Sequence, residues 1–203
     1  MIDHWFPTSI WITKSNCVDK IEDIKSSCWA ILNDLDKNID KNPFVESHLK
    51  SSFWHDSYGH LDTDDRFSFL KNIIEDQAIS FLTLLGFPGI TYANLRFTNM
   101  WVNLIEANDY HALHQHGTTG KSYISGVYYV TSPSNATINF SSPYMDAYEP
   151  LPPYMDNENN FKMARYFCTP GNLIMFRSYV YHGYDSHKSS EPKISIPFNI
   201  AVE

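Results

Sequence analysis

The feature that most limits the possible folds is a series of short strand-like segments that begins at Tyr92. The segments are rich in aromatic and β-branched residues and are separated by turn-forming residues, as is typical of antiparallel sheets. Eight such strands are predicted, over residues 92–105, 110–116, 123–131, 136–140, 163–168, 173–176, 179–182 and 193–201. Eight short strands of this kind favour a double-sheet jelly roll, also called a double-stranded β-helix.

The residues before Tyr92 show a different pattern, in which apolar residues recur every three or four positions. This period predicts two packing helices, one over residues 19–39 and one that begins at Thr63 as its N-cap and ends near Leu85. A short edge strand is expected within residues 5–13, because Pro7 is tolerated at the edge of a sheet.

The predicted fold class is therefore mainly β, with N-terminal helices that pack on the jelly roll. A chain of 203 residues is expected to form a single domain. Within it, residues 1–91 would supply the first strand and the helices, and residues 92–203 the double-stranded β-helix core.

Composition excludes several classes of protein. The net charge of −8 argues against general nucleic-acid binding, which needs clustered Lys and Arg. No apolar run approaches the roughly 18–20 residues that cross a membrane, and the N-terminus lacks a signal-peptide pattern. The 3 cysteines are scattered and form no Cys-x-x-Cys pair, so a reducing, cytoplasmic setting is expected.

Two histidines, His114 and His116, stand two residues apart at the end of a predicted strand. Side chains at this spacing share one strand face, so both imidazoles can reach one metal ion, although such pairs are also common as ordinary surface histidines. His182 follows a Pro-Gly turn and an apolar strand and is a third candidate. His111, three residues before His114, is expected to face away, and His187, in a polar loop, is expected to be solvated.

Several motifs occur together in an order that resembles the 2-oxoglutarate-dependent Fe(II) oxygenases, and more closely one oxygenase family among them. The resemblance extends from Leu95 to the C-terminus. Its motifs read His114-Gln115-His116, Ser125-Gly126-Val127-Tyr128-Tyr129-Val130, Pro170-Gly171-Asn172-Leu173-Ile174-Met175-Phe176, His182, Lys193-Ile194-Ser195 and Phe198-Asn199. The chain differs from the wider superfamily in having His-x-His in place of His-x-Asp or His-x-Glu, and from the closer family in having Lys193 in place of Arg.

The resemblance implies that His114, His116 and His182 hold one Fe(II) and leave three coordination positions open. Two would take the 2-oxoacid end of 2-oxoglutarate and the third O₂, and an unidentified substrate would be oxidised, with hydroxylation the expected reaction. The resemblance also places the far carboxylate of 2-oxoglutarate at Lys193 and Ser195.

Two further residues are candidates for binding this co-substrate. Tyr129 can donate a hydrogen bond to the same carboxylate, and Asn103, on a preceding strand, can line the cavity. Each of these assignments has an ordinary structural alternative, since Lys193 can be an edge-strand lysine and Tyr129 a core aromatic residue.

Two other functions remain open at this point. The chain can be a non-catalytic jelly-roll protein with a binding or structural role, because a fold does not fix a function. It can also be a three-histidine dioxygenase that does not use 2-oxoglutarate, although such an enzyme has no need of the Lys193-x-Ser195 pair. Residues 141–161 form a long proline-containing connection, interpreted either as a lid over the cavity or as a solvated loop.

Overall fold

The computed structural model describes residues 7–14, 20–35, 49–117, 121–143, 155, 157 and 160–203. The α-helices are α1 (Ile21–Leu35) and α2 (Ser68–Leu84). The strands are β1 (Ile10–Lys14), β2 (Lys50–Ser51), β3 (Leu95–Met100), β4 (Asn103–Ile105), β5 (His111–His114), β6 (Ile124–Thr131), β7 (Thr137–Ser141), β8 (Met163–Phe167), β9 (Asn172–Arg177), β10 (His182–Tyr184) and β11 (Lys193–Val202). Short 3₁₀ turns are η2 (Leu61–Thr63), η3 (Asp65–Phe67) and η4 (Tyr92–Asn94). No helix in these ranges is long and apolar enough to cross a membrane.

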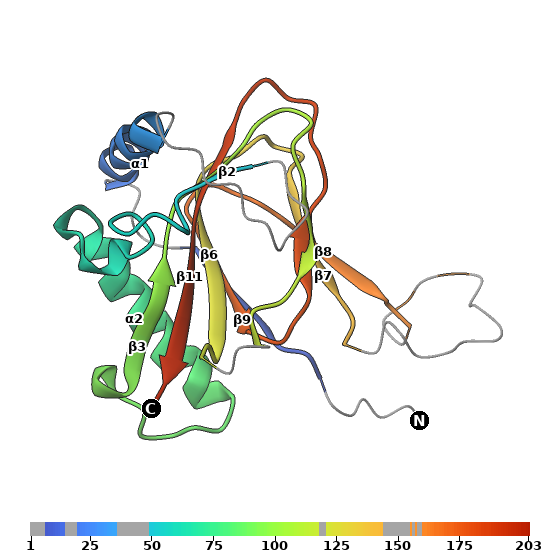
Figure 1. The fold of residues 1–203 in the computed structure, drawn as a ribbon. Helices are drawn as coiled ribbons and strands as arrows, with labels where there is room; N and C mark the ends of the chain where they lie inside the picture. Colours follow the sequence, from blue (N-terminus) through green and yellow to red (C-terminus); the bar gives the residue numbers. More distant parts are fainter. Residues whose placement is uncertain are drawn as a thin grey trace.

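The strands form two antiparallel sheets that face each other (Figure 1). The larger sheet has the order β1-β9-β6-β11-β4-β2, and β3 pairs with β11 beyond the end of β4. The smaller sheet has the order β5-β10-β7-β8. The predicted jelly roll is therefore confirmed, and β1 lies at a sheet edge, as expected for the first strand.

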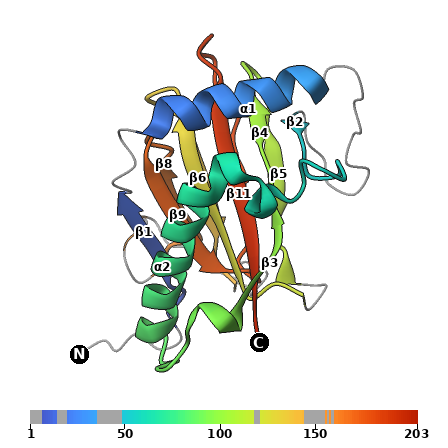
Figure 2. The ribbon, with the colours of Figure 1, turned by 90° about the vertical axis from the view of Figure 1, so that its left-hand side faces the viewer.

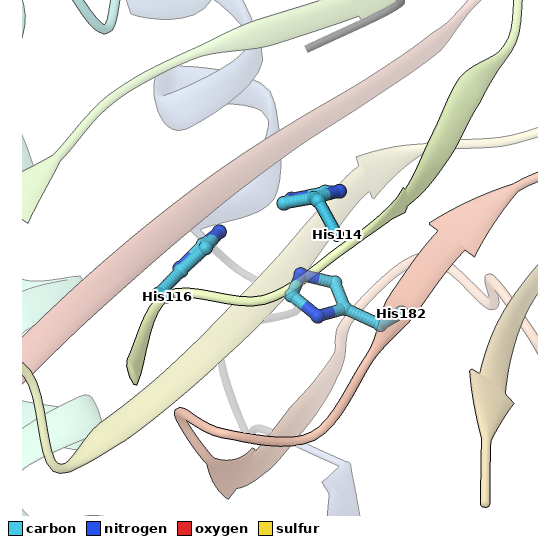
Figure 3. A group of neighbouring side chains, drawn as sticks. All are labelled: His114, His116 and His182. Atoms are coloured by element: carbon cyan, nitrogen blue, oxygen red, sulfur yellow. The ribbon is translucent and has the colours of Figure 1, made fainter. Parts of the chain in front are cut away.

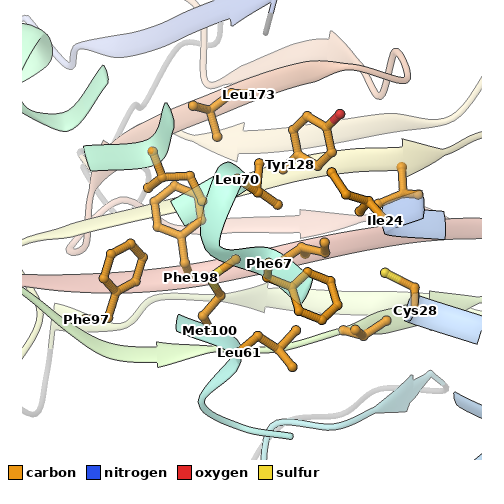
Figure 4. Packing of buried hydrophobic residues seen from close by; sticks show 14 of the residues in the cluster. Ile24, Cys28, Leu61, Phe67, Leu70, Phe97, Met100, Tyr128, Leu173 and Phe198 are labelled. Carbon is orange, nitrogen blue, oxygen red and sulfur yellow. The ribbon is translucent and has the colours of Figure 1, made fainter. Parts of the chain in front are cut away.

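Both helices cover the outer face of the larger sheet (Figure 2). Their apolar faces, which include Cys28, Leu32, Leu70 and Ile74, pack against residues of the sheet in one continuous core (Figure 4). A second core lies between the two sheets and contains Tyr129, Phe140, Phe176 and Tyr184. The larger sheet is thus buried on both faces, and only the space between the sheets contains the candidate site residues.

The second helix begins later than the sequence predicts. Thr63 ends η2, where its hydroxyl donates to the carbonyl of His60 at 2.9 Å, and it does not cap the helix. Asp64 instead accepts a hydrogen bond from the backbone N–H of Arg66 at 3.0 Å and caps η3. Two 3₁₀ turns therefore precede α2, because each provides its own local backbone hydrogen bonds.

The predicted strand over residues 92–105 is split into β3 and β4. The break lies opposite Pro197 in β11, whose carbonyl accepts from the N–H of Trp101 at 3.1 Å. Proline has no N–H to offer the neighbouring strand, so the ladder is interrupted there. As a result, β4 pairs with the start of β11 and β3 with its end.

The predicted strand over residues 179–182 is a turn that leads into β10. The N–H of Val180 donates to the carbonyl of Arg177 at 2.9 Å, which closes the turn directly after β9. This turn carries the chain from the larger sheet to the smaller one. Strand pairing then starts at His182 rather than ending there.

Candidate metal centre

Three histidines converge between the two sheets (Figure 3). His114 ends β5 and lies directly opposite His182, the first residue of β10, in the antiparallel register. His116 lies just beyond β5, where its N–H donates to the carbonyl of Ser178 at 2.9 Å. The connection that carries His116 therefore joins the smaller sheet to the larger one, and it points the imidazole back toward the other two histidines.

The geometry of the three rings suits a single metal ion. One nitrogen from each ring lies within 4.8 Å of the corresponding nitrogens of the others. The centroids of the His114 and His182 rings are 4.4 Å apart, and the His116 ring lies 5.0 Å from each. Imidazole nitrogens arranged in this way can occupy three coordination positions of one divalent transition metal.

Each ring is oriented by a hydrogen bond from its Nδ1 atom. Nδ1 of His114 lies 2.9 Å from the carbonyl of Ala112, and Nδ1 of His182 lies 3.0 Å from the carbonyl of Val180. A carbonyl only accepts, so both Nδ1 atoms carry the proton and both Nε2 atoms present a lone pair. This arrangement is typical of metal-binding histidines, whose second nitrogen is held by an acceptor.

His116 is held by side chains of the larger sheet. Its Nδ1 lies 2.7 Å from Oδ1 of Asn199, on β11, and 3.2 Å from Oγ of Ser125, on β6. Ser125 also donates to Oδ1 of Asn199 at 2.7 Å, so the three side chains form one small network. Asn199 and Ser125 thus orient His116 through the nitrogen that faces away from the other histidines.

Burial keeps these histidines neutral. It lowers the pKa of His114 to about 4, with a smaller contribution from His116. Burial also lowers the pKa of His116, against the hydrogen bond to Asn199, and places the pKa of His182 well below its usual range. A metal ion binds neutral imidazole, so at neutral pH protons do not compete for the site.

His111 also lies in the cavity, and the expectation that it faces away was wrong. Its ring centroid is 4.1 Å from that of His114, and both residues line the same pocket. The cause is a bulge in β5, where it pairs with β10. His182 opposes His114 and Tyr184 opposes His111, so two residue steps in β10 are matched by three in β5. Gly183 makes this possible, since a Cβ there would approach the His111 carbonyl to 2.6 Å.

A buried cation lies deeper between the sheets. Lys193, the first residue of β11, is 1% exposed, and its Nζ lies 3.1 Å from the ring centroid of Tyr184. Within the described ranges it forms no salt bridge. Burial lowers the pKa of Lys193 to about 8, with Cys168 acting weakly in the opposite direction.

The other predicted co-substrate residues surround the same region. Ser195 is fully buried, and its Oγ has no hydrogen-bond partner among the residues that the structure describes. The hydroxyl of Tyr129 lies 3.4 Å from that of Tyr184, and the strand register places Tyr129 and Asn103 on either side of Ser195. Asn103 lines the pocket and accepts from Nε1 of Trp101 at 3.0 Å.

Sequence reasoning missed three residues in or beside this cavity and, in addition to His111, misplaced His187. Asn199, Ser125 and Tyr184 were given no role, although each lies an even number of residues from a site residue on its own strand. His187, expected to be solvated, is 5% exposed, and its Nε2 lies 3.3 Å from the carbonyl of Ile105. Most of residues 141–161, the proposed lid, lies outside the described ranges.

The family model described as "Putative 2OG-Fe(II) oxygenase" matches residues 99–199, and no curated protein matches the chain. A prolyl-4-hydroxylase from Pseudomonas putida has a TM-score of 0.62 at 9% identity, covering 97% of this chain and 94% of the other. AviO1 from Streptomyces viridochromogenes has a TM-score of 0.63 at 10% identity, covering 96% and 90%.

HygX from Streptomyces hygroscopicus, solved with nickel, 2-oxoglutarate and hygromycin B bound, is a further similar structure. Its TM-score is 0.60 at 12% identity, covering 96% of this chain and 83% of HygX. At such identities the structural likeness shows a shared fold. The family match covers residues 99–199, and this range includes the strands that carry His114, His182 and Lys193.

Proposed function

We propose that this chain, which belongs over residues 99–199 to the putative 2OG-Fe(II) oxygenase family, oxidises a substrate in a reaction that depends on Fe(II), 2-oxoglutarate and O₂. One observation supports this most directly. One ring nitrogen from each of three histidines converges at one pocket, and behind Tyr184 in the wall of that pocket lies a buried lysine without an anionic partner among the described residues. A metal ion would bind at the histidines, and a dicarboxylate would reach the lysine.

The metal-binding residues we propose are His114, His116 and His182. Their Nδ1 hydrogen bonds hold the rings in place before the ion arrives, so little ordering is needed on binding. When bound, Fe(II) and 2-oxoglutarate together supply the activation of O₂, and hydroxylation of the substrate is the expected outcome. The histidines contribute no charge, so the site is more positive than one with a carboxylate ligand, which favours a dianionic co-substrate.

The co-substrate residues we propose are Lys193, Ser195, Tyr129 and Asn103. A buried cation without a counter-ion is unfavourable, and the lowered pKa of Lys193 reflects this. A carboxylate at Nζ would remove the penalty, and Oγ of Ser195 would gain a partner as well. Tyr129 can donate to the same carboxylate, whereas Asn103 lies nearer the histidines in the pocket wall.

Two alternatives are weaker. A non-catalytic jelly roll has no need of three histidines that are each oriented for a metal. A three-histidine dioxygenase that does not use 2-oxoglutarate has no need of Lys193, which would then be a buried charge without a ligand. We also propose a cytoplasmic location, consistent with Cys28 and Cys168 being free thiols.

Two measurements test the function. Titration of 2-oxoglutarate into the Fe(II)-loaded protein without oxygen should produce a weak visible charge-transfer band, and exposure to O₂ should yield succinate. His182→Ala is the control, and it should show neither signal. A wild-type protein that binds Fe(II) but gives neither the band nor succinate would support the dioxygenase that does not use 2-oxoglutarate.

A further inference from the structure

Tyr184 lies where the histidine pocket and the buried lysine meet. The pocket wall includes Tyr184 together with His111, His114, His116 and His182. Lys193, Ser195 and Tyr129 are not among the described residues that line it. Tyr184 lines the pocket, Lys193 does not, and Nζ of Lys193 lies 3.1 Å from the Tyr184 ring centroid, so the aromatic ring separates the lysine from the pocket.

The Tyr184 ring is the group that contacts the charged end of Lys193 in this structure. Tyr184 is 7% exposed, so its contact with the ammonium group is shielded from water, where a cation–π interaction is strongest. An ammonium group nevertheless binds a carboxylate better than an aromatic face, because it then forms charge-assisted hydrogen bonds. An arriving carboxylate can therefore replace the ring.

The other contacts of Tyr184 are compatible with movement. Its hydroxyl lies 3.4 Å from the hydroxyl of Tyr129, at the long limit of a hydrogen bond. Its ring is nearly parallel to that of His111, at an interplanar angle of 14° and a centroid distance of 6.4 Å. The backbone of Tyr184 lies beside Gly183, opposite the bulge in β5, so the residue sits where the pairing of β10 with β5 is already irregular.

We propose that Tyr184 is a displaceable partner of Lys193, which the far carboxylate of the co-substrate must move aside in order to reach the ammonium group. The proposal rests on the proposed function and extends it to co-substrate choice. A 2-oxoacid without a second carboxylate, such as pyruvate, leaves the ring in place. A dicarboxylic 2-oxoacid exchanges the ring for a stronger partner, so Lys193 favours dicarboxylic acids, whereas the ring lowers their affinity by the free energy needed to displace it.

The test uses anaerobic Fe(II)-loaded protein and 2-oxoglutarate as the probe, followed by the visible band. Binding in the wild type should be limited by movement of the ring, so the observed rate should reach a plateau as the 2-oxoglutarate concentration rises. Tyr184→Leu removes the ring, and it should bind on the order of tenfold more tightly, with a rate that rises linearly. Tyr184→Phe keeps the ring and should behave like the wild type, plateau included.

The outcomes separate this proposal from the function on which it rests. If the wild type binds 2-oxoglutarate at a rate that stays linear with concentration, Tyr184 is not displaced and the proposed function stands. Equal or weaker binding by Tyr184→Leu, in protein that takes up one equivalent of Fe(II) and unfolds cooperatively, also overturns the proposal. No binding by the wild type overturns both. The wild-type rate alone decides the matter if the leucine variant does not fold.

Discussion

The two faces of β11 are equally buried but differ in chemistry. Ile194, Ile196, Phe198 and Ile200 are each 0% exposed and belong to the core under the helices. The alternate residues, which face the cavity between the sheets, are Lys193, Ser195, Pro197 and Asn199, and the three polar ones are at most 5% exposed. Burial therefore does not identify the site, whereas the kind of group that is buried does.

The comparison separates stability from function along one strand. The helix side gains free energy from apolar burial, at roughly 25 cal/mol per Å². The cavity side keeps polar groups whose burial costs free energy as long as no ligand pairs with them, namely the Lys193 ammonium group and the Oγ of Ser195. Buried groups of this kind are expected where a ligand will satisfy them.

The largest effect is expected from removing a proposed metal ligand. His182→Ala deletes the most deeply buried imidazole of the cluster and should abolish stoichiometric Fe(II) binding, because two imidazoles do not hold the ion tightly. His114→Ala should do the same. The measurement is metal content after anaerobic reconstitution, with Phe198→Ala as the control from the other face of β11, which should keep one equivalent in its folded fraction.

The last position of the His-x-His motif, His116, sharpens this test. His116→Ala should weaken Fe(II) binding strongly, whereas His116→Asp should restore it, because a carboxylate can complete the same set of three ligands. A full equivalent of iron at normal affinity in His116→Ala would mean that His116 is not a ligand.

A large loss of stability is expected on the helix side. Phe198 is 0% exposed, and its ring approaches Phe97 at a centroid distance of 6.2 Å. Phe198→Ala should reduce the free energy of unfolding by about 3–5 kcal/mol, because it leaves a cavity in the core. Chemical denaturation gives this value. A loss below about 1 kcal/mol would mean that the core under the helices relaxes around the cavity.

Lys193→Met should show the opposite behaviour. Methionine fills a similar volume without a buried charge, so the free energy of unfolding should be unchanged or higher than in the wild type. Affinity for 2-oxoglutarate should fall on the order of 10²-fold, with Fe(II) binding kept, because the charge-assisted contact is lost. A clear loss of stability with unchanged affinity would make Lys193 a structural residue.

The sequence predicts much of this arrangement because the jelly roll repeats a simple pattern. Strand composition located most of the strands, and motif order singled out His114, His116, His182 and Lys193. The bulge in β5 opposite Gly183 could not be predicted, since it depends on how β5 and β10 pair, and it brings His111 into the cavity. The burial of His187 likewise follows from a contact with Ile105, 82 residues away in the chain.

Asn199 could have been found from the sequence, because alternate residues of a strand share one face and Asn199 lies four residues after Ser195 on β11. It lies on the cavity side of β11 and accepts from Nδ1 of His116 at 2.7 Å. Asn199→Ala should weaken Fe(II) binding by about 10- to 100-fold, because His116 loses its orienting partner. Asn199→Asp keeps an acceptor and should retain wild-type affinity, measured by competition with a chelator. Equal losses in both variants would point to packing at this position and not to the hydrogen bond.

The smallest effect concerns pH. Because burial lowers the pKa of Lys193 to about 8, the ammonium group of the ligand-free protein loses its proton as the pH rises through that value. Only the protonated form attracts a carboxylate, so affinity for 2-oxoglutarate should be constant below pH 8 and fall by up to about tenfold per pH unit above it. Lys193→Arg stays protonated throughout this range and provides the matched control. Titrations of both Fe(II)-loaded proteins between pH 6.5 and about 9.5 should therefore diverge only above pH 8. Parallel profiles would assign the pH dependence to the metal site and would place the far carboxylate away from Lys193.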